Sequence, residues 1–157
     1  MFVPEHFEIR ELVWPEFYEA NKDYGERLFL ALDARALVCL DALRRRFGPL
    51  TVNDWAWGGS FRLSGLRPMG SGTGARLSQH IFGRAFDCKF RDVTADEVRE
   101  DLLAWQAAGR PERSAADARA EAYSPICRIE RVPDMSWFHF DVGNHDPARD
   151  GVLVVGR

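Results

Sequence analysis

The chain has 157 residues and a mass of 17.9 kDa, enough for one domain with a substantial hydrophobic core. Hydrophobic residues make up 46% and charged residues 29%, an ordinary balance for a soluble globular protein. The net charge of -3 argues against a general nucleic-acid-binding protein, and no apolar run approaches the ~20 residues of a membrane helix. We therefore expect a single domain, residues 1–157, that binds neither nucleic acid nor a membrane.

Three cysteines, Cys39, Cys88 and Cys127, are scattered along the chain and form no CxxC pair. This pattern predicts reduced thiols in a cytosolic protein rather than a disulfide framework. The N-terminus shows no basic region followed by an apolar stretch, so we expect the chain to be cytoplasmic as synthesised. A substrate outside the cytoplasm would then require delivery by other means.

Residues 1–32 mix aromatic and acidic positions, and we expect them to wrap the core as irregular structure with a short helix. The first clear helical pattern follows Asp33, a good N-cap residue, and the Gly-Pro pair at 48–49 ends it. Residues 50–52 predict a short strand. Residues 53–74 are rich in glycine and aromatics and predict a loop of the kind that often carries a functional site.

The second half of the chain begins with residues 85–90, whose alternating character predicts a strand. Thr94 and Glu97 form a capping box ahead of a second helical pattern, which Gly109 ends. An alanine-rich stretch at 114–121 predicts another short helix.

Two further strands are predicted at residues 126–132 and 137–142, and residues 152–155 predict a last edge strand. In the second of these, His139 stands between two phenylalanines, so its side chain points away from the face that they occupy. Together these elements predict an α+β domain with a central antiparallel sheet flanked by helices.

The most informative stretch is residues 78–87, in which His80 precedes a glycine turn and Asp87 lies in the strand that follows. Such a turn brings an imidazole and a carboxylate onto one face, and His139 is the third candidate ligand. Two histidines and one carboxylate suit zinc and leave the fourth tetrahedral position open, as in catalytic zinc sites. The alternative is that a lone histidine in a strand is a hydrogen-bonded core residue.

Residues 78–87 resemble, position for position, the Ser-x-His-x-x-Gly-x-Ala-x-Asp signature of the zinc D-Ala-D-Ala carboxypeptidase family. Residues 64–67, Ser-Gly-Leu-Arg, look like the Ser-Gly-Tyr-Arg element of that family, and residues 137–141 look like its C-terminal histidine strand. The family includes vancomycin-resistance dipeptidases, bacterial cell-wall carboxypeptidases and phage endolysins, and it shares its fold with the Hedgehog signalling domain. The resemblance implies a metal-site core over about residues 50–143 and a Hedgehog/DD-peptidase-like fold.

The resemblance also implies the roles of particular residues. His80, Asp87 and His139 would be the ligands of Zn²⁺. Arg67 would neutralise a substrate carboxylate or polarise the scissile carbonyl, and the alternative for this residue is a surface salt bridge. Ser78 would order the metal loop through a hydrogen bond.

The resemblance weakens at the general base that peptide hydrolysis requires. Many members of the family place an acidic residue three positions before the last histidine, where this chain has Ser136. Asp134, on the loop that enters the strand, is our first substitute, and Glu130, on the preceding strand, is the second. Asp141 shares a face with His139, and its alternatives are the base, a partner of that ligand or a structural ion pair.

The leading hypothesis is a zinc peptidase that cuts a bond involving a D-amino acid in peptidoglycan stem peptides, with a zinc-activated water as nucleophile. It would act as a carboxypeptidase or as an endolysin-type endopeptidase, at the cell wall after release or in a phage particle. The alternative is a non-catalytic zinc-binding structural or interaction module, such as a virion component, which Ser136 favours. A third hypothesis is that no metal binds. We expect a monomer whose partner is a peptidoglycan peptide.

Overall fold

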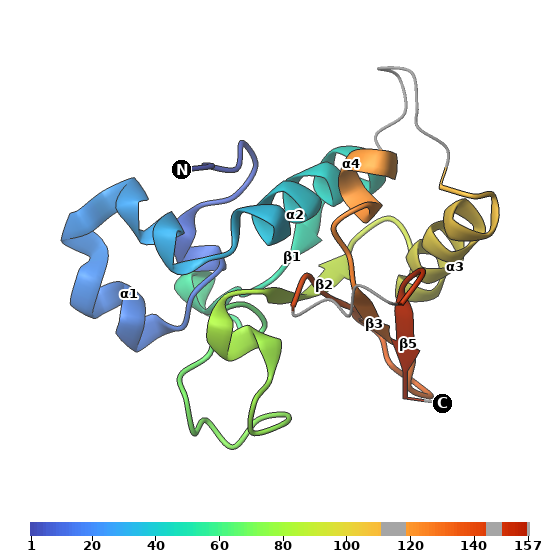
Figure 1. Ribbon diagram of the computed structural model, residues 1–157. Coiled ribbons are helices and arrows are strands. Elements are labelled where there is room, and N and C mark those ends of the chain that lie inside the picture. Colours follow the sequence, from blue (N-terminus) through green and yellow to red (C-terminus); the bar gives the residue numbers. More distant parts are fainter. Residues whose placement is uncertain (111–118, 144–148, 157) are drawn as a thin grey trace.

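A five-stranded mixed sheet in the order β1-β2-β4-β3-β5 forms the centre of this computed structural model, which describes residues 1–110, 119–143 and 149–156 (Figure 1). The strands are β1 (Leu50–Thr51), β2 (Ala85–Phe90), β3 (Arg128–Glu130), β4 (Phe138–Asp141) and β5 (Leu153–Val155). The α-helices are α1 (Pro15–Asn21), α2 (Ala34–Phe47), α3 (Ala95–Ala107) and α4 (Arg119–Tyr123). The predicted α+β class is confirmed.

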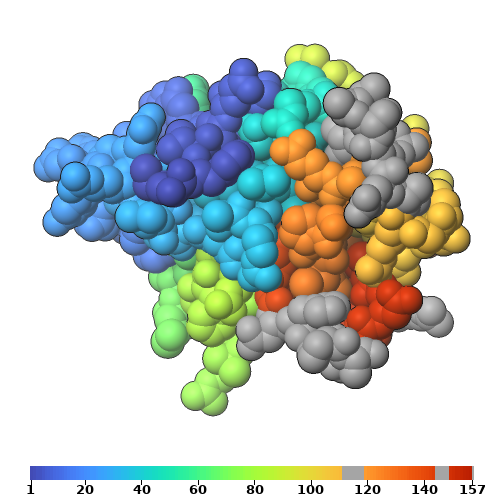
Figure 2. All heavy atoms as spheres, turned by 45° about the horizontal axis from the view of Figure 1, so that its top comes forward, coloured from blue at the N-terminus to red at the C-terminus, as the bar shows by residue number. Residues whose placement is uncertain are grey.

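The N-terminal segment is more helical than predicted. Besides α1, it contains the short 3-10 helices η1 (Ile9–Glu11) and η2 (Lys22–Ala31), and the chain turns at Gly25 within the latter. Figure 2 shows this segment, in blue, lying against α2, in cyan. The predicted wrap of the core is therefore present, with more regular structure than its aromatic and acidic pattern indicated.

The predicted antiparallel sheet is corrected in one respect, because β5 pairs with β3 in the parallel direction. The pairs β1–β2, β2–β4 and β3–β4 are antiparallel. Since β4 is antiparallel to β3, β5 lies on the other edge of β3 and runs in the direction opposite to β4. The edge strand itself was predicted; its direction depends on the connection, which has no sequence pattern of its own.

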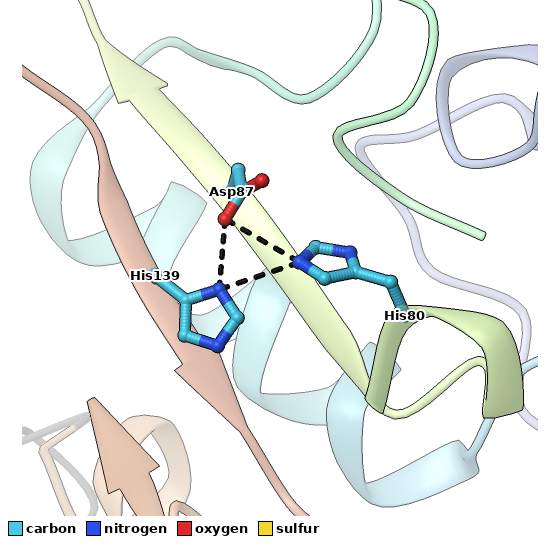
Figure 3. Close-up of side chains that lie close together, drawn as sticks. All are labelled: His80, Asp87 and His139. Atoms are coloured by element: carbon cyan, nitrogen blue, oxygen red, sulfur yellow. Dashed lines mark hydrogen bonds and ion pairs between the residues drawn. The ribbon is translucent and has the colours of Figure 1, made fainter. Parts of the chain in front are cut away.

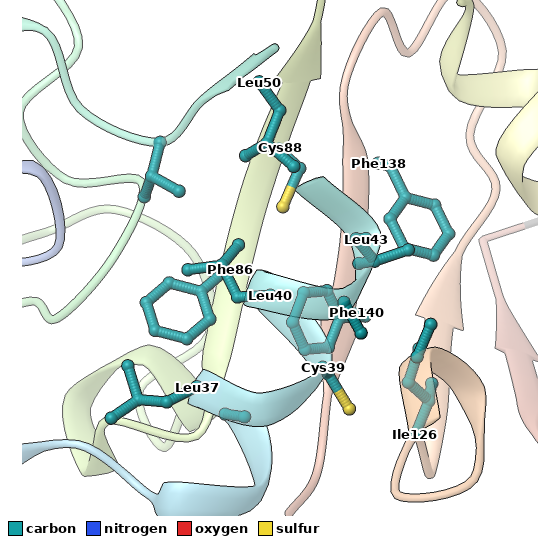
Figure 4. Packing of buried hydrophobic residues seen from close by; sticks show 14 of the residues in the cluster. Leu37, Cys39, Leu40, Leu43, Leu50, Phe86, Cys88, Ile126, Phe138 and Phe140 are labelled. Atoms are coloured by element: carbon teal, nitrogen blue, oxygen red, sulfur yellow. The ribbon is translucent and has the colours of Figure 1, made fainter. Parts of the chain in front are cut away.

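The hydrophobic core lies between the sheet and helix α2, whose leucines pack against phenylalanines of β2 and β4 (Figure 4). The residues at the centre of this packing are Leu37, Leu40, Leu43, Phe86, Phe138 and Phe140. Burying one such side chain stabilises the fold by about 1.5–3 kcal/mol. Because successive side chains of a strand point to opposite faces, burial of these phenylalanines sends the residues between them to the other side of the sheet.

The helix signals read from the sequence operate as predicted. The Asp33 carboxylate accepts a hydrogen bond from the backbone N–H of Arg35, and Gly48 ends α2 with φ 80°. Thr94 and Glu97 make both hydrogen bonds of the capping box at the start of α3.

Some predicted boundaries shift. The strand expected at 126–132 is shorter, because β3 covers Arg128–Glu130, and β4 covers Phe138–Asp141. The helix expected at 114–121 lies mostly outside the described residues, and α4 begins at Arg119. The three cysteines are free thiols. In the described part of the chain, no helix has the length and apolar character to cross a membrane.

Candidate metal centre

The register of the sheet brings two of the predicted ligands together. Asp87 of β2 and His139 of β4 form a directly opposed cross-strand pair on the face away from α2. His80 comes from η4 (Gln79–Phe82), the 3-10 helix that precedes β2, and its ring points at the same centre (Figure 3). The three residues predicted as ligands therefore meet in space.

Three donor atoms of these side chains converge on one point. His139 Nδ1 lies 2.8 Å from Asp87 Oδ1 and 3.3 Å from His80 Nε2. His80 Nε2 lies 3.4 Å from Asp87 Oδ1. His80 and His139 are buried, with 1% and 5% of their surface exposed. A cation could contact all three atoms with the two rings and the carboxylate arranged as they are.

The spacing of the donor atoms fits zinc. Tetrahedral zinc with bonds of about 2.0–2.1 Å holds its ligand atoms about 3.3–3.4 Å apart. Two of the three separations, 3.3 and 3.4 Å, match this value, and the third, 2.8 Å, is that of a hydrogen bond that a metal would replace. Two imidazoles and one carboxylate are also ligands that zinc accepts, and they leave one tetrahedral position for water or substrate.

The backbone of Gly65 orients the His80 ring. His80 Nδ1 lies 2.9 Å from the Gly65 carbonyl oxygen, and because a carbonyl only accepts, Nδ1 carries the proton. Nε2 therefore presents its lone pair to the centre, as metal-binding histidines generally require. A larger residue at position 65 would clash with the N-terminal segment, because its Cβ would lie 2.2 Å from the carbonyl oxygen of Leu12.

Gly83 makes the turn between His80 and the strand. Its φ of 66° lies in the left-handed region, and a Cβ would meet the carbonyl oxygen of Ala31 at 2.3 Å. Its own carbonyl accepts a hydrogen bond from the backbone N–H of Asp33 at 2.9 Å. The turn is thus fixed both by its own conformation and by contact with the chain entering α2.

Arg67 forms an ion pair with Asp87, one of the three candidate ligands. Its Nη2 donates to Asp87 Oδ2 at 2.6 Å, and its Nε donates to the carbonyl of Leu63. Asp87 is left with Oδ1 facing the histidines. The sequence predicted either a substrate contact or a surface salt bridge for Arg67; the structure shows an ion pair, but a buried one, with the side chain 9% exposed.

His139 faces two more carboxylates from its other ring nitrogen. Nε2 lies 3.7 Å from Asp141 Oδ2 and 3.9 Å from Glu130 Oε1, and it is buried without a hydrogen-bond partner among the described residues. Asp141 is anchored by Arg128, whose Nε donates to Oδ2 at 2.6 Å, and by the backbone N–H of Gly143. Of the three roles considered for Asp141, this placement favours that of a partner of His139. Its carboxylate is held in place by the ion pair with Arg128.

Charges around the centre favour a bound cation. Burial would raise the pKa of Asp87, but the hydrogen bond from His139 and the nearby His80 ring hold it well below its usual range, so its carboxyl is ionised. Burial lowers the pKa of His80, which keeps this ring neutral. Burial also acts to lower the pKa of His139, but the carboxylates of Asp141 and Asp87 outweigh it and raise this pKa to about 9. The protonated His139 ring therefore balances part of the negative charge of the surrounding carboxylates.

The centre opens into a cavity of about 370 Å³. The ligands lie on its wall with residues of the glycine-rich loop and of β3, and with Trp137: Arg67, Thr73, Gly74, Ala75, Leu77, Ser78, His80, Asp87, Arg128, Glu130, Trp137 and His139. The cavity thus combines three residues that could hold a metal ion with a further carboxylate, Glu130, and two arginines, Arg67 and Arg128.

Of the two carboxylates proposed as general base, the structure brings only Glu130 to this cavity. Asp134 lies in the turn after β3 with φ 61°, and it lines a different cavity together with Ser136 and the start of α3. The preference for Asp134 is therefore corrected in favour of Glu130. Asp134 is nearer to His139 in the sequence than Glu130 is, but the turn after β3 places it in the wall of the other cavity.

Ser78 was expected to order the metal loop through a hydrogen bond, and the structure shows such bonds at its backbone. Its hydroxyl does not cap η4; instead its backbone N–H donates to Ala75 and its carbonyl accepts from Ile81. The side chain lines the cavity. Arg128 was not predicted as a site residue, because one arginine in a short strand carries no signal until its partner Asp141 is placed.

A second group with potential metal-binding atoms, Glu5, His6 and Asp41, lies in the N-terminal half. Its buried carboxylate, Asp41, is already used, because Oδ1 accepts from His6 and Oδ2 pairs with Arg45 at 2.8 Å. This group is a link between the N-terminal segment and α2.

Comparison with protein-family models, curated proteins and solved structures finds no match to the chain. Function is therefore inferred from the residues of the site.

Proposed function

We propose that this protein is a zinc-dependent peptidase that acts on D-amino-acid-containing stem peptides of peptidoglycan, at the cell wall after release or from a phage particle. The observation that carries the proposal is the convergence of His80 Nε2, Asp87 Oδ1 and His139 Nδ1 within 2.8–3.4 Å of one another beside a carboxylate-bearing cavity. The resemblance of residues 78–87 to the carboxypeptidase signature supplies the substrate class.

Besides the three candidate ligands, three residues of the cavity have a part in the proposed hydrolysis: Glu130, Arg67 and Arg128. Bound zinc would supply a Lewis acid that polarises the scissile carbonyl and lowers the pKa of a water molecule. Glu130 takes a proton from the attacking water as the new C–O bond forms, and it returns the proton to the leaving amine as the C–N bond breaks. Arg67 holds Asp87 in place and Arg128 holds Asp141, and both guanidinium groups line the cavity, where their further N–H donors suit a peptide carboxylate.

Digestion of purified peptidoglycan by the zinc-loaded protein tests the proposal, with released fragments identified by mass spectrometry. We expect release by the native protein and none by His80→Ala, and the fragment masses name the bond that is cut. A protein shown to carry zinc that releases nothing would contradict the peptidase proposal.

The second candidate function is a non-catalytic zinc-binding structural or interaction module. Ser136 favours it, because the position that is acidic in many members of the resembling family cannot act as a base here. The discriminating variant is Glu130→Gln. If hydrolysis is unaffected by removing this carboxylate, Glu130 is not the base; if there is no hydrolysis from the zinc-loaded native protein, the module is the better description.

A further inference from the structure

A buried arginine behind the metal centre joins the two strands that carry Glu130 and His139. Arg99, on α3, has only 1% of its surface exposed. Its Nε donates to the carbonyl of Glu130 at 2.9 Å, and its Nη2 donates to the carbonyl of Trp137. Its Nη1 pairs with the Asp96 carboxylate at 2.9 Å. One planar guanidinium thus connects the end of β3, the approach to β4 and the first turn of α3.

The position of these contacts matters because the ladder between β3 and β4 stops just before them. Its pairs are Arg128 with Asp141 and Ile129 with Phe140. Glu130 would be the next residue on β3 and His139 the next on β4, but these two are not paired in the ladder. Where the strands separate, Arg99 replaces the missing ladder bonds by holding one carbonyl from each side.

Glu130 points its side chain away from this contact. Ile129 is fully buried on the core face, so the alternation of a strand directs the Glu130 side chain to the cavity, where Oε1 lies 3.9 Å from His139 Nε2. Unlike the ligands, the Glu130 carboxylate has no hydrogen bond to another described side chain. The backbone contact to Arg99, together with the pairing of Glu130 with Val155 of β5, is what sets its distance from the metal centre.

We infer that Arg99 is a positioning residue for the proposed base: it fixes the separation of Glu130 from the metal centre through the backbone of β3 and β4. The inference rests on the proposed function of Glu130. A buried arginine is suited to this task because its rigid fork spans two carbonyls at once, which the single ammonium of lysine does not reproduce. The charge of Arg99 is compensated by Asp96, so the contact costs less than an unpaired buried cation would.

Arg99→Lys is the direct test, made on the full chain loaded with zinc. A displacement of the base by about 1 Å lowers turnover by about 10²-fold. We expect a fall of that size in kcat with KM and zinc content unchanged, because Arg99 touches neither substrate nor ligand. Arg46→Lys is the matched control: Arg46 pairs with Asp101 in a partly buried bridge between α2 and α3, away from the cavity, and its loss should leave kcat unchanged.

A double-variant cycle separates positioning from a merely structural effect. If Arg99 acts through Glu130, the Arg99→Lys change slows the native protein but has no further effect in a Glu130→Gln background. Independent, multiplying effects in the two backgrounds would overturn the inference. Asp96→Asn, at a residue whose side chain is 63% exposed, is a milder variant that preserves folding, and we expect a smaller loss in the same direction.

Crystal structures of the zinc-loaded native and Arg99→Lys proteins provide a readout independent of hydrolysis. We expect the Glu130 carboxylate to retreat from His139 by about 1 Å or more, while the three ligands stay in place. An unmoved Glu130 would overturn the inference even if the protein is an active peptidase. Conversely, a native protein that hydrolyses nothing but shows this displacement in the variant would contradict the proposed function and leave the positioning role of Arg99 intact.

Discussion

The two neighbours of His139 are held in different ways. On one side, β2 presents Asp87 through a continuous antiparallel ladder with β4, and the short turn at Gly83 brings His80 to the same point. On the other side, the ladder with β3 ends before Glu130, and the carboxylate is placed by a helix side chain, Arg99. The convergence of the three candidate ligands thus follows from local backbone geometry, whereas the position of the proposed base depends on a long-range contact.

Because of this difference, we expect the half of the site that holds the candidate ligands to tolerate substitution better than the half that holds Glu130. Each ligand has a second partner: His80 bonds Gly65, Asp87 bonds Arg67, and His139 faces Asp141. Such partners fix ring orientation and raise metal affinity. The Glu130 backbone is held by Arg99 and by its pairing with β5, and its carboxylate has no hydrogen bond to another described side chain. We therefore expect metal binding to survive substitutions that abolish turnover.

Removal of a ligand should have the largest effect. His80→Ala leaves two protein ligands, and we expect zinc affinity to fall by more than about a hundredfold, since loss of a ligand's partner alone costs about 10–100-fold. Metal content after dialysis, measured by mass spectrometry, checks this. His6→Ala is the matched control, because His6 belongs to the group around Asp41 and its loss should leave zinc bound. Equal zinc content in both variants would contradict the assigned ligand set.

The next effect in size is expected for the proposed base. Glu130→Gln keeps the shape of the side chain but removes its ability to take a proton, and we expect kcat to fall by about 10²–10⁴-fold with zinc retained. Asp134→Asn is the control, because Asp134 lines another cavity, and its activity should match that of the native protein. The reverse pattern would return the base to Asp134.

A smaller effect is expected where Asp141 faces His139. Asp141→Asn removes the negative charge 3.7 Å from Nε2, and we expect zinc affinity to fall by about 10–100-fold. Competition with a chelator of known affinity measures this change. An unchanged affinity would show that Asp141 serves only its ion pair with Arg128.

The smallest effect belongs to the scaffold away from the site. Thr94→Ala removes the side-chain acceptor of the capping box at the start of α3, which should lower the free energy of unfolding by about 1 kcal/mol. Urea denaturation measures it, and zinc content should not change. A large loss of zinc in this variant would mean that the start of α3 is coupled to the metal centre more tightly than the contacts of Arg99 imply.

The same contrast explains how far the sequence could be interpreted. The spacing of His80, Gly83 and Asp87 reflects a local turn and a strand, and alternation along β4 directs His139 to the same face, so residue pattern is enough to predict that these three side chains meet. Residue pattern does not show that Glu130, and not Asp134, lines the same cavity as these residues, because the end of β3 depends on contacts with α3.

Other features left no local signal for the same reason. The parallel direction of β5 follows from a connection without a pattern, and the commitment of Arg67 to Asp87 follows from the fold of the loop between them. The sequence also does not indicate that position 65 requires glycine. The close approach of the Leu12 backbone leaves no room for a Cβ there, and the Gly65 carbonyl orients His80. In each case the contact joins residues far apart in the chain, and short-range spacing carries no information about it.

The central claim is that one metal ion is held by His80, Asp87 and His139. Anomalous X-ray scattering at the zinc edge, from crystals of the zinc-loaded protein, tests it most directly. We expect one strong peak about 2.0–2.2 Å from His80 Nε2, Asp87 Oδ1 and His139 Nδ1. The absence of a peak between these three atoms, or a peak at Glu5, His6 and Asp41 instead, would contradict it.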